Sequence, residues 1–384
     1  MTSLLIYLVI ILAIVAVVQI LRVFELSNFL NGEDGINVTD RETNNISLMW
    51  VLFLIAYFAG FIYLVVRFGP HLLPEAASEH GAAIDTLMDF NLIIITAVFV
   101  LTHIVMIYFV YRYAKTRSPK ATYVTHNNKL EFIWTIAPAI VLAIIIIYGI
   151  NTWNKAMREK PNGALNIELY ARQFDWTARY AGQDTTLGHA NFLMISGTNP
   201  LGLINNQRLD ERLGEYDQWV SDLEESRGKV YPGGKTDREI LDKISTVKKH
   251  KALVEQMKAQ SAVKDYSVAD DDIIVKGEFH IPVGKPVNFQ IRSQDVIHSA
   301  YMPHFRAQMN AVPGMMTSFY FTPTITSEEM RNKLGNPEFD YLLYCNKICG
   351  AAHYNMQMKI IVETEEAYNQ WLAEQKKFYT ADAQ

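Results

Sequence analysis

Residues 345 to 356 read Cys-Asn-Lys-Ile-Cys-Gly-Ala-Ala-His-Tyr-Asn-Met. They supply two thiols from Cys345 and Cys349, an imidazole from His353 and a thioether from Met356. A second imidazole, His298, lies 47 residues before the first thiol, and the chain of 384 residues has only these two cysteines. Because copper prefers soft sulfur and imidazole ligands, the pattern predicts a copper site.

The donor set exceeds what a single copper ion needs. A mononuclear cupredoxin site uses one Cys, two His and a weak axial Met, and this chain adds a second Cys. Two thiolates can bridge two copper ions, with one His on each ion. Three alternatives stay open from the residues alone: a disulfide, a structural zinc site and a thioredoxin-like copper chaperone. A disulfide leaves the two imidazoles and Met356 unexplained, and a thioether is a poor zinc ligand.

Composition excludes several other classes of protein. The net charge is -5 and the pI is about 6.1, so nothing indicates a nucleic-acid partner. Two cysteines do not make a disulfide scaffold, and without a CxxCH motif the chain has no covalent haem attachment site. A mean hydropathy of +0.04 conceals an apolar N-terminal part and a charged remainder.

Four apolar runs are about long enough to cross a bilayer, at residues 4–21, 46–66, 91–111 and 132–150. We expect the first to be a retained helix, because no basic residue precedes it and no small-residue cleavage site follows. The loop after the third run is basic and should stay in the cytoplasm, which puts the C-terminal part outside; its residues are Arg112, Lys115, Arg117, Lys120 and Lys129. His103 lies inside the third run, so it is either a functional residue or a neutral, hydrogen-bonded histidine.

The remainder favours short strands. Alternating or apolar segments predict strands at 166–172, 273–275, 287–291, 319–321 and 341–344. Frequent turns between them indicate an all-β sandwich or barrel. Residues 205–262 differ, because apolar positions recur at helical spacing on both sides of a Pro-Gly-Gly break at 232–234. We expect an antiparallel helical hairpin inserted into the β domain, either packing on itself or docking a partner.

Several motifs of this chain resemble those of subunit II of cytochrome c oxidase, a haem-copper oxidase. Residues 293–299 resemble the family's SxDVIHS, 311–314 its AxPG and 345–356 its CSEICGxxHxxM. Residues 131–138 resemble the ExxWTxxP that opens the second helix of the family's membrane hairpin, and 173–176 resemble its QWxW. The resemblance covers residues 85–182 and 270–362.

This resemblance implies a dinuclear CuA centre in an extracytoplasmic cupredoxin domain. Cys345 and Cys349 would bridge the coppers, and His298 and His353 would each bind one. Met356 would be a weak axial ligand, with the backbone carbonyl of Lys347 opposite. Electrons would enter from cytochrome c, or a tethered cytochrome c domain, near Phe174 and Trp176. They would pass to haem a of subunit I, which also holds CuB, for oxygen reduction coupled to proton pumping.

Further expectations concern the membrane partners. Glu131 matches the acid at the mouth of a proton pathway shared with subunit I, although an interfacial charge explains it equally well. Subunit III and lipid are the other expected partners. The resemblance places the chain in a bacterial-type cytoplasmic (inner) membrane, with its C-terminal domain on the periplasmic side.

Four departures from the family pattern are informative. Lys347 stands where a magnesium-binding Glu is usual, and an ammonium cannot ligate a cation, so a magnesium site is doubtful. Phe174 replaces the electron-entry Trp, Arg179 stands where the docking face has an acid, and Met315 replaces an Arg. We therefore expect a donor contact that depends less on long-range charge attraction.

The expected organisation is a multi-pass membrane protein with a soluble domain. Residues 1–70 would form two additional transmembrane helices and 85–155 the subunit II hairpin. Residues 160–365 would form the cupredoxin domain, interrupted by the hairpin at 205–262, and 366–384 a tail. The alternative function is a membrane-anchored copper-binding or copper-delivery protein. A related quinol oxidase subunit would lack the copper ligands that this chain has.

Overall fold

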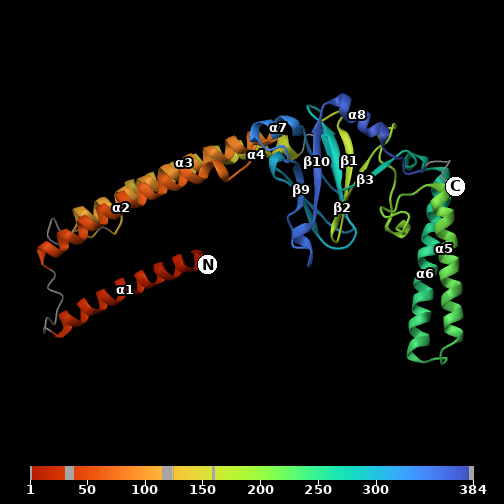
Figure 1. Cartoon of the computed structure of the whole chain (residues 1–384), viewed down its shortest axis with the longest axis horizontal. Helices are drawn as coiled ribbons and strands as arrows, with labels where there is room; N and C mark the ends of the chain where they lie inside the picture. Colours follow the sequence, from red (N-terminus) through yellow and green to blue (C-terminus); the bar gives the residue numbers. More distant parts are fainter. Residues whose placement is uncertain (1, 31–38, 115–122, 124, 158–160, 380–384) are drawn as a thin grey trace. The chain divides into compact units, whose positions relative to one another are not determined.

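The structure is a computed structural model that describes residues 2–30, 39–114, 123, 125–157 and 161–379 (Figure 1). It divides into two units, Met1–Leu72 with Leu92–Thr135, and Leu73–Asn91 with Ile136–Gln384. Three of the basic residues that set the predicted orientation, Lys115, Arg117 and Lys120, lie outside the described residues.

Long helices form where the sequence is apolar. They are α1 (Thr2–Leu30), α2 (Asp40–Phe68), α3 (Glu79–Arg112) and α4 (Asn128–Met157). Within the described part of the chain, three helices are long and apolar enough to cross a membrane, the regions Asp40–His71, Glu79–Arg112 and Asn128–Met157. The apolar stretch described within α1, Ile11–Phe24, is shorter. The first of the four expected spans therefore stays a prediction.

His103 lies on α3 among aromatic rings. Its Nδ1 lies 2.8 Å from the carbonyl oxygen of Phe99 one turn earlier, and its ring stacks on Tyr57 of α2 with centroids 5.7 Å apart. The hydrogen bond thus stays within its own helix, whereas the ring packs on the neighbouring one. A bond from this ring to a neighbouring helix or subunit, and a functional role for His103, both stay predictions.

The soluble part is a sandwich of two five-stranded sheets, as the strand pattern predicted. One has the order β3-β2-β1-β5-β8 and the other β4-β10-β9-β6-β7. Their strands are β1 (Leu165–Arg172), β2 (Asp175–Tyr180), β3 (Ile273–Lys276), β4 (Glu278–Pro282), β5 (Val287–Ser293), β6 (His298–Met302), β7 (Ala307–Ala311), β8 (Thr317–Phe321), β9 (Tyr341–Cys345) and β10 (Gln357–Glu363).

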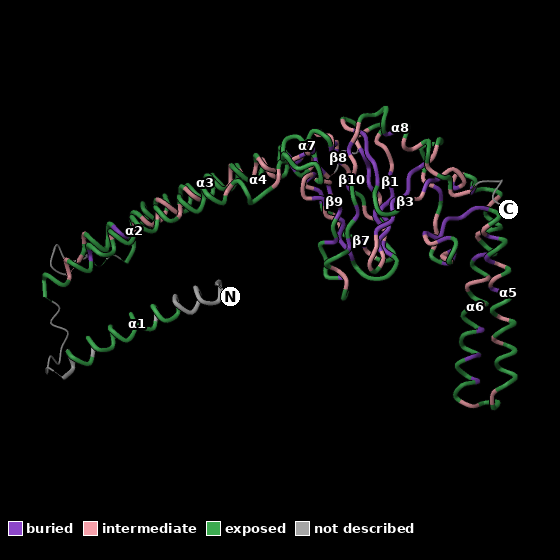
Figure 2. Tube along the Cα trace, in the orientation of Figure 1, coloured by how far each residue is buried: buried purple, intermediate pink, exposed green. Residues whose placement is uncertain are grey.

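The buried side chains gather where the two sheets face each other (Figure 2). Alternation along each strand sends every second residue inward, so Phe279 and Ile281 of β4 enter the same core as Phe289 and Ile291 of β5. β1 and β5 run parallel, with Leu165 opposite Val287 and Ala171 opposite Ser293. The loops that follow these two strands therefore emerge at the same end of the sandwich.

Residues 205–262 contain α5 (Asn206–Gly228) and α6 (Lys235–Ala259), which lie side by side. Their shared core includes Leu209, Tyr216 and Val254. Ion pairs cross between the helices, Lys248 with Glu224 and Lys251 with Asp217, in the order that an antiparallel pair requires. Two further helices are α7 (Ser327–Leu334) and α8 (Glu365–Glu374). The segment expected to be a tail thus begins inside α8, which packs Tyr368 and Trp371 on the sandwich core.

Candidate metal centre

The predicted copper ligands come together at one end of the sandwich. His298 is the first residue of β6, Cys345 is the last of β9, and the loop to β10 carries Cys349, His353 and Met356. His298 is fully buried, and both cysteines are less than 10% exposed. One group of metal-ligating side chains is recognised among the described residues, and it is His298, Cys345 and Cys349, whose donor atoms lie within 4.8 Å of one another.

His353 and Met356 lie beside the sulfur of Cys349. The Sγ atoms of Cys345 and Cys349 are 3.9 Å apart. His298 Nδ1 lies 3.8 Å from the Cys345 sulfur, and His353 Nδ1 lies 3.5 Å from the Cys349 sulfur. The Met356 sulfur is 3.9 Å from Cys349 Sγ. Each imidazole thus lies beside one thiol, His298 beside Cys345 and His353 beside Cys349.

Asp295 fixes the orientation of His298. Its Oδ1 lies 2.8 Å from His298 Nε2, on the ring nitrogen that does not face the sulfurs. When Nε2–H donates to this carboxylate, the lone pair of Nδ1 points to the cluster, which is the arrangement of a metal-ligating histidine. Burial opposes ionisation of Asp295. Hydrogen bonds from the Gln173 amide, His298 and the Val296 amide outweigh it and lower the pKa of the carboxyl.

The β1–β2 turn holds the ligand loop in place. The Gln173 side chain donates to the carbonyl of Cys349 at 2.5 Å, and its backbone N–H donates to Asp295 at 2.7 Å. Gly350 makes this approach possible, because its φ is +145° and a Cβ there would lie 2.8 Å from the Phe174 ring. A side chain at position 350 would therefore push the turn and the ligand loop apart.

The donor set fits copper. Burial, and then the neighbouring Cys345, raise the pKa of the Cys349 thiol to about 11. A metal cation supplies the positive charge that such buried thiolates need. Two sulfurs, two imidazole nitrogens and a thioether, largely shielded from water, are soft donors suited to copper.

Lys347 contributes its backbone to this cluster. Its carbonyl oxygen accepts from the Cys345 thiol at 3.2 Å, while the residue as a whole is exposed. The predicted electron-entry residues, Phe174 and Trp176, lie beside the candidate ligands. Trp176 is fully buried, with its ring centroid 6.2 Å from that of His298, and Phe174 is partly buried against the core.

Glu131 lies far along the chain from these groups, in the first turn of α4. Its side chain is 44% exposed and lies 3.7 Å from His126 Nδ1. A carboxylate near a helix N-terminus is stabilised by the helix dipole, so its position agrees with an interfacial charge and leaves a proton-entry role open.

The expectation that Arg179 lies on the face that docks the electron donor is wrong. Arg179 is 2% exposed and pairs with two carboxylates that are fully buried, Glu168 at 2.5 Å and Asp272 at 2.6 Å. It therefore takes no part in a docking surface. A charged residue in a strand looks exposed in the sequence, because the sequence does not show which opposite charges will surround it.

Sequence reasoning assigned no role to Asp295, Gln173 or Gly350. The signals for Asp295 were its place three residues before His298 and its membership of the SxDVIHS motif. Gln173 and Gly350 act on the ligand loop from another part of the chain, so no local pattern could reveal their contact.

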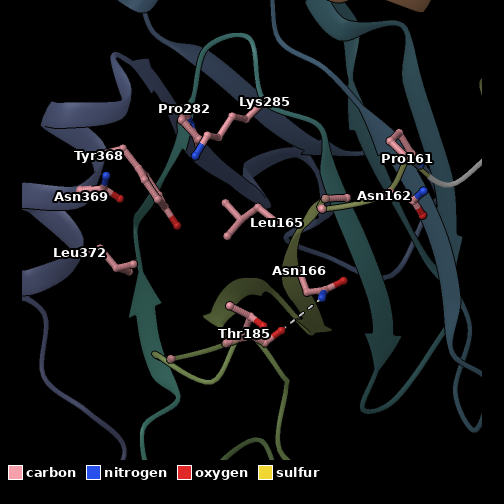
Figure 3. A pocket seen from close by; sticks show the side chains of 14 residues that line it. Pro161, Asn162, Leu165, Asn166, Thr185, Pro282, Lys285, Tyr368, Asn369 and Leu372 are labelled. Carbon is pink, nitrogen blue, oxygen red and sulfur yellow. Dashed lines mark hydrogen bonds between the residues drawn. The ribbon is translucent and has the colours of Figure 1, made fainter.

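A pocket of about 650 Å³ lies at the opposite end of β1 and β5 from the metal ligands (Figure 3). Its lining includes Leu165, Pro282, Lys285 and Leu372. Figure 3 shows the Tyr368 side chain pointing into it. None of the predicted copper ligands lines this pocket, so it is separate from the metal centre.

Comparisons with known proteins agree with this geometry. The family profile described as cytochrome C oxidase subunit II, transmembrane domain, matches residues 66–151, and the one described as its periplasmic domain matches residues 247–364. The alternative cytochrome c oxidase subunit 2 of Bradyrhizobium diazoefficiens is 29% identical over 85% of this chain and 91% of its own length.

Two further similarities are weaker. Cytochrome c oxidase subunit 2 of Thermostichus vulcanus is 25% identical over 84% of this chain and 85% of its own length. A solved structure of the periplasmic domain of subunit II of Bradyrhizobium japonicum aligns with 56% of this chain and 95% of its own, at 13% identity and a TM-score of 0.29. With both domains matched in order and relatives aligned over most of their length, the chain belongs to the cytochrome c oxidase subunit II family.

Proposed function

We propose that this chain is the electron-entry subunit of a haem-copper terminal oxidase. It accepts electrons from cytochrome c and passes them to haem a of subunit I, where oxygen is reduced to water with proton pumping. The observation that carries this proposal is the convergence of two thiols, two imidazoles and a thioether at one end of the sandwich. The family assignment supports the same role.

The donors divide naturally between two copper ions. Cys345 and Cys349 would hold both ions, His298 and His353 would each bind one, and Met356 and the Lys347 carbonyl would be the weaker ligands. Such a copper pair would supply a one-electron relay. The chain's own part is to orient the donors and exclude water: Asp295 sets the tautomer of His298, and Gln173 holds the ligand loop through the Cys349 carbonyl.

The surface beside the ligands supports a donor contact that depends little on charge. In the ligand loops, Ile348 is 89% exposed, Tyr354 is 88% exposed and Ile297 is 45% exposed. Apolar and aromatic side chains of this kind form the centres of many protein interfaces. Fast oxidation of a soluble basic cytochrome c with a steep salt dependence would contradict this part of the proposal.

The membrane part supports placement in a bacterial-type inner membrane with the cupredoxin domain on the periplasmic side. We assign residues 1–70 to two additional transmembrane helices, 85–155 to the subunit II hairpin and 160–365 to the CuA domain. Residues 205–262 are an insertion in that domain. Subunits I and III and lipid are the proposed neighbours, and Glu131 the proposed entrance of a proton pathway. Because Lys347 cannot ligate a cation, we propose no magnesium site through its side chain.

Electron paramagnetic resonance of the copper-loaded full-length chain in detergent tests the copper assignment. We expect the signal of a delocalised mixed-valence pair. Cys349→Ser removes one bridge and should abolish that delocalisation. Ile348→Ala, which changes an exposed neighbour and no donor, is the matched control and should keep the signal. A single-copper spectrum, or no copper uptake, in the unaltered chain would refute the assignment.

A further inference from the structure

A histidine and two carboxylates, His280, Glu278 and Glu363, lie on the outer face of the second sheet. Phe279 and Ile281 of β4 point into the core, so Glu278 and His280 on the same strand point away from it. β10 lies beside β4 with Ile361 opposite His280, which places Glu363 diagonally across from the histidine. None of these three residues belongs to the predicted copper site.

Contacts with three residues, Tyr180, Glu363 and Trp371, fix His280 in one orientation. Its backbone N–H donates to the Tyr180 hydroxyl at 2.7 Å, and that hydroxyl donates to its carbonyl at 2.8 Å. Its Nδ1 lies 2.7 Å from a carboxylate oxygen of Glu363. Its ring stacks flat on Trp371 of α8, with centroids 4.0 Å apart and planes 10° apart. The residue is 8% exposed, so backbone, Nδ1 and ring face are all held by neighbours.

The remaining ring nitrogen has no hydrogen-bond partner. His280 Nε2 is buried and unbonded, and its nearest carboxylate oxygen, on Glu278, lies 3.7 Å away. That distance is too long for a hydrogen bond. It is close to the ~3.4 Å that separates two ligands when each lies about 2.1 Å from one tetrahedral zinc ion. When Nδ1–H donates to Glu363, the neutral ring carries its lone pair on Nε2, the nitrogen nearer Glu278, as in carboxylate–histidine–metal arrangements.

We propose that His280 Nε2 and the Glu278 carboxylate form a binding site for a divalent transition-metal ion of the zinc class. Glu363 is the positioning residue, and water completes the coordination. Lys359, which lies opposite Glu278 on β10, directs its ammonium to Asp340 at 2.6 Å, so that its charge is already compensated. The competing account is a protonated histidine that bridges two carboxylates and binds no metal.

Cobalt titration of the copper-loaded full-length chain in detergent separates the two accounts. Co²⁺ is a spectroscopic substitute for Zn²⁺, and its visible absorption reports ligation. A paramagnetic ion at Nε2 should also quench the fluorescence of Trp371, which stacks on the same ring. In the unaltered chain we expect quenching that saturates with one Co²⁺ and is reversed by added Zn²⁺.

The variant Glu278→Gln removes one ligand. Because the Glu278 side chain is 51% exposed, this variant is expected to fold. We expect it to weaken Co²⁺ binding at least tenfold and to remove the quenching. Glu338→Gln, at another exposed position, is the matched control and should titrate like the unaltered chain. If Co²⁺ does not quench the fluorescence of the unaltered chain, or binds Glu278→Gln with equal affinity, the proposed metal site is refuted. The competing account, a protonated His280 between two carboxylates, would then stand.

Discussion

Replacing Arg179 by methionine removes the central cation of a buried charge network while keeping a side chain of similar length. The guanidinium donates to Glu168 at 2.5 Å, to Asp272 at 2.6 Å and to the Gly188 carbonyl at 2.9 Å. Glu168 keeps a second cation, because Arg292 also pairs with it. Asp272 keeps only the Gly188 N–H, at 3.1 Å. The loss therefore falls mainly on Asp272, which is fully buried.

Breaking a buried ion pair from one side costs about 3–5 kcal/mol, because the remaining carboxyl must either stay charged without its partner or take up a proton. For a domain of this size, 1 kcal/mol shifts the midpoint of thermal unfolding by about 2–4 °C. Arg179→Met should thus lower the midpoint by roughly 6–20 °C. The metal donors are not in this network, so the copper spectrum at low temperature should be unchanged.

Calorimetry of the copper-loaded full-length chain in detergent measures this shift. Arg238→Met, at an exposed position of α6, is the matched control and should change the midpoint little. If Arg179→Met lowers the midpoint no more than Arg238→Met, the buried network does not hold the fold as argued. If Arg179→Met left the midpoint of thermal unfolding unchanged but altered the salt dependence of cytochrome c oxidation, Arg179 would act in donor docking after all.

Three further outcomes are expected. Asp295→Ala removes the hydrogen bond that orients the His298 ring and should weaken copper binding about 10- to 100-fold in a competition titration. An unchanged copper affinity would contradict this role of Asp295. Gly350→Ala places a Cβ 2.8 Å from Phe174 at a φ of +145° and should distort the copper spectrum as well as lower the thermal midpoint; an unaltered spectrum counts against the close approach. Burial raises the pKa of Asp272 from 3.8 to about 6 despite Arg179, so its protonation favours the folded state and this stabilisation fades as pH rises through that interval. The midpoint of Asp272→Asn relative to the unaltered chain should therefore rise across the same interval, and a flat difference would contradict the pKa.

The candidate copper ligands could be recognised in the sequence because their chemistry is local. Four of the five donor side chains lie within twelve residues, and few functions use that combination of sulfur and imidazole. Strands with a clear alternation, such as β1 and β5, were also predictable, and the structure confirms them. β2 was not predicted, since its Asp-Trp-Thr-Ala-Arg-Tyr sequence mixes charges with buried residues. The burial of its Arg179 depends on Glu168 of β1 and on Asp272, which directly precedes β3.

Gln173 and Asp295 lie inside the motifs at 173–176 and 293–299, yet the sequence does not predict their roles, because those roles depend on contacts between distant parts of the chain. A ligand is recognisable by its own atoms, whereas a positioning residue is recognisable only by what it touches. Gln173 reaches across 176 residues of sequence to the Cys349 carbonyl and across 122 to Asp295. Those contacts exist because β1 and β5 run parallel and release their loops at one end of the sandwich.

Lys347 shows where a change of residue type matters and where it does not. Its carbonyl lies 3.2 Å from the Cys345 sulfur, a contact that the backbone makes whatever the side chain is. The exposed ammonium, in contrast, cannot replace a carboxylate as a cation ligand. A single position therefore offers its backbone carbonyl to the candidate copper site and no side-chain ligand to a magnesium ion. Substituting Lys347 by Glu should accordingly leave the copper spectrum unchanged, and a changed spectrum would show that the side chain, and not the carbonyl alone, shapes the copper site.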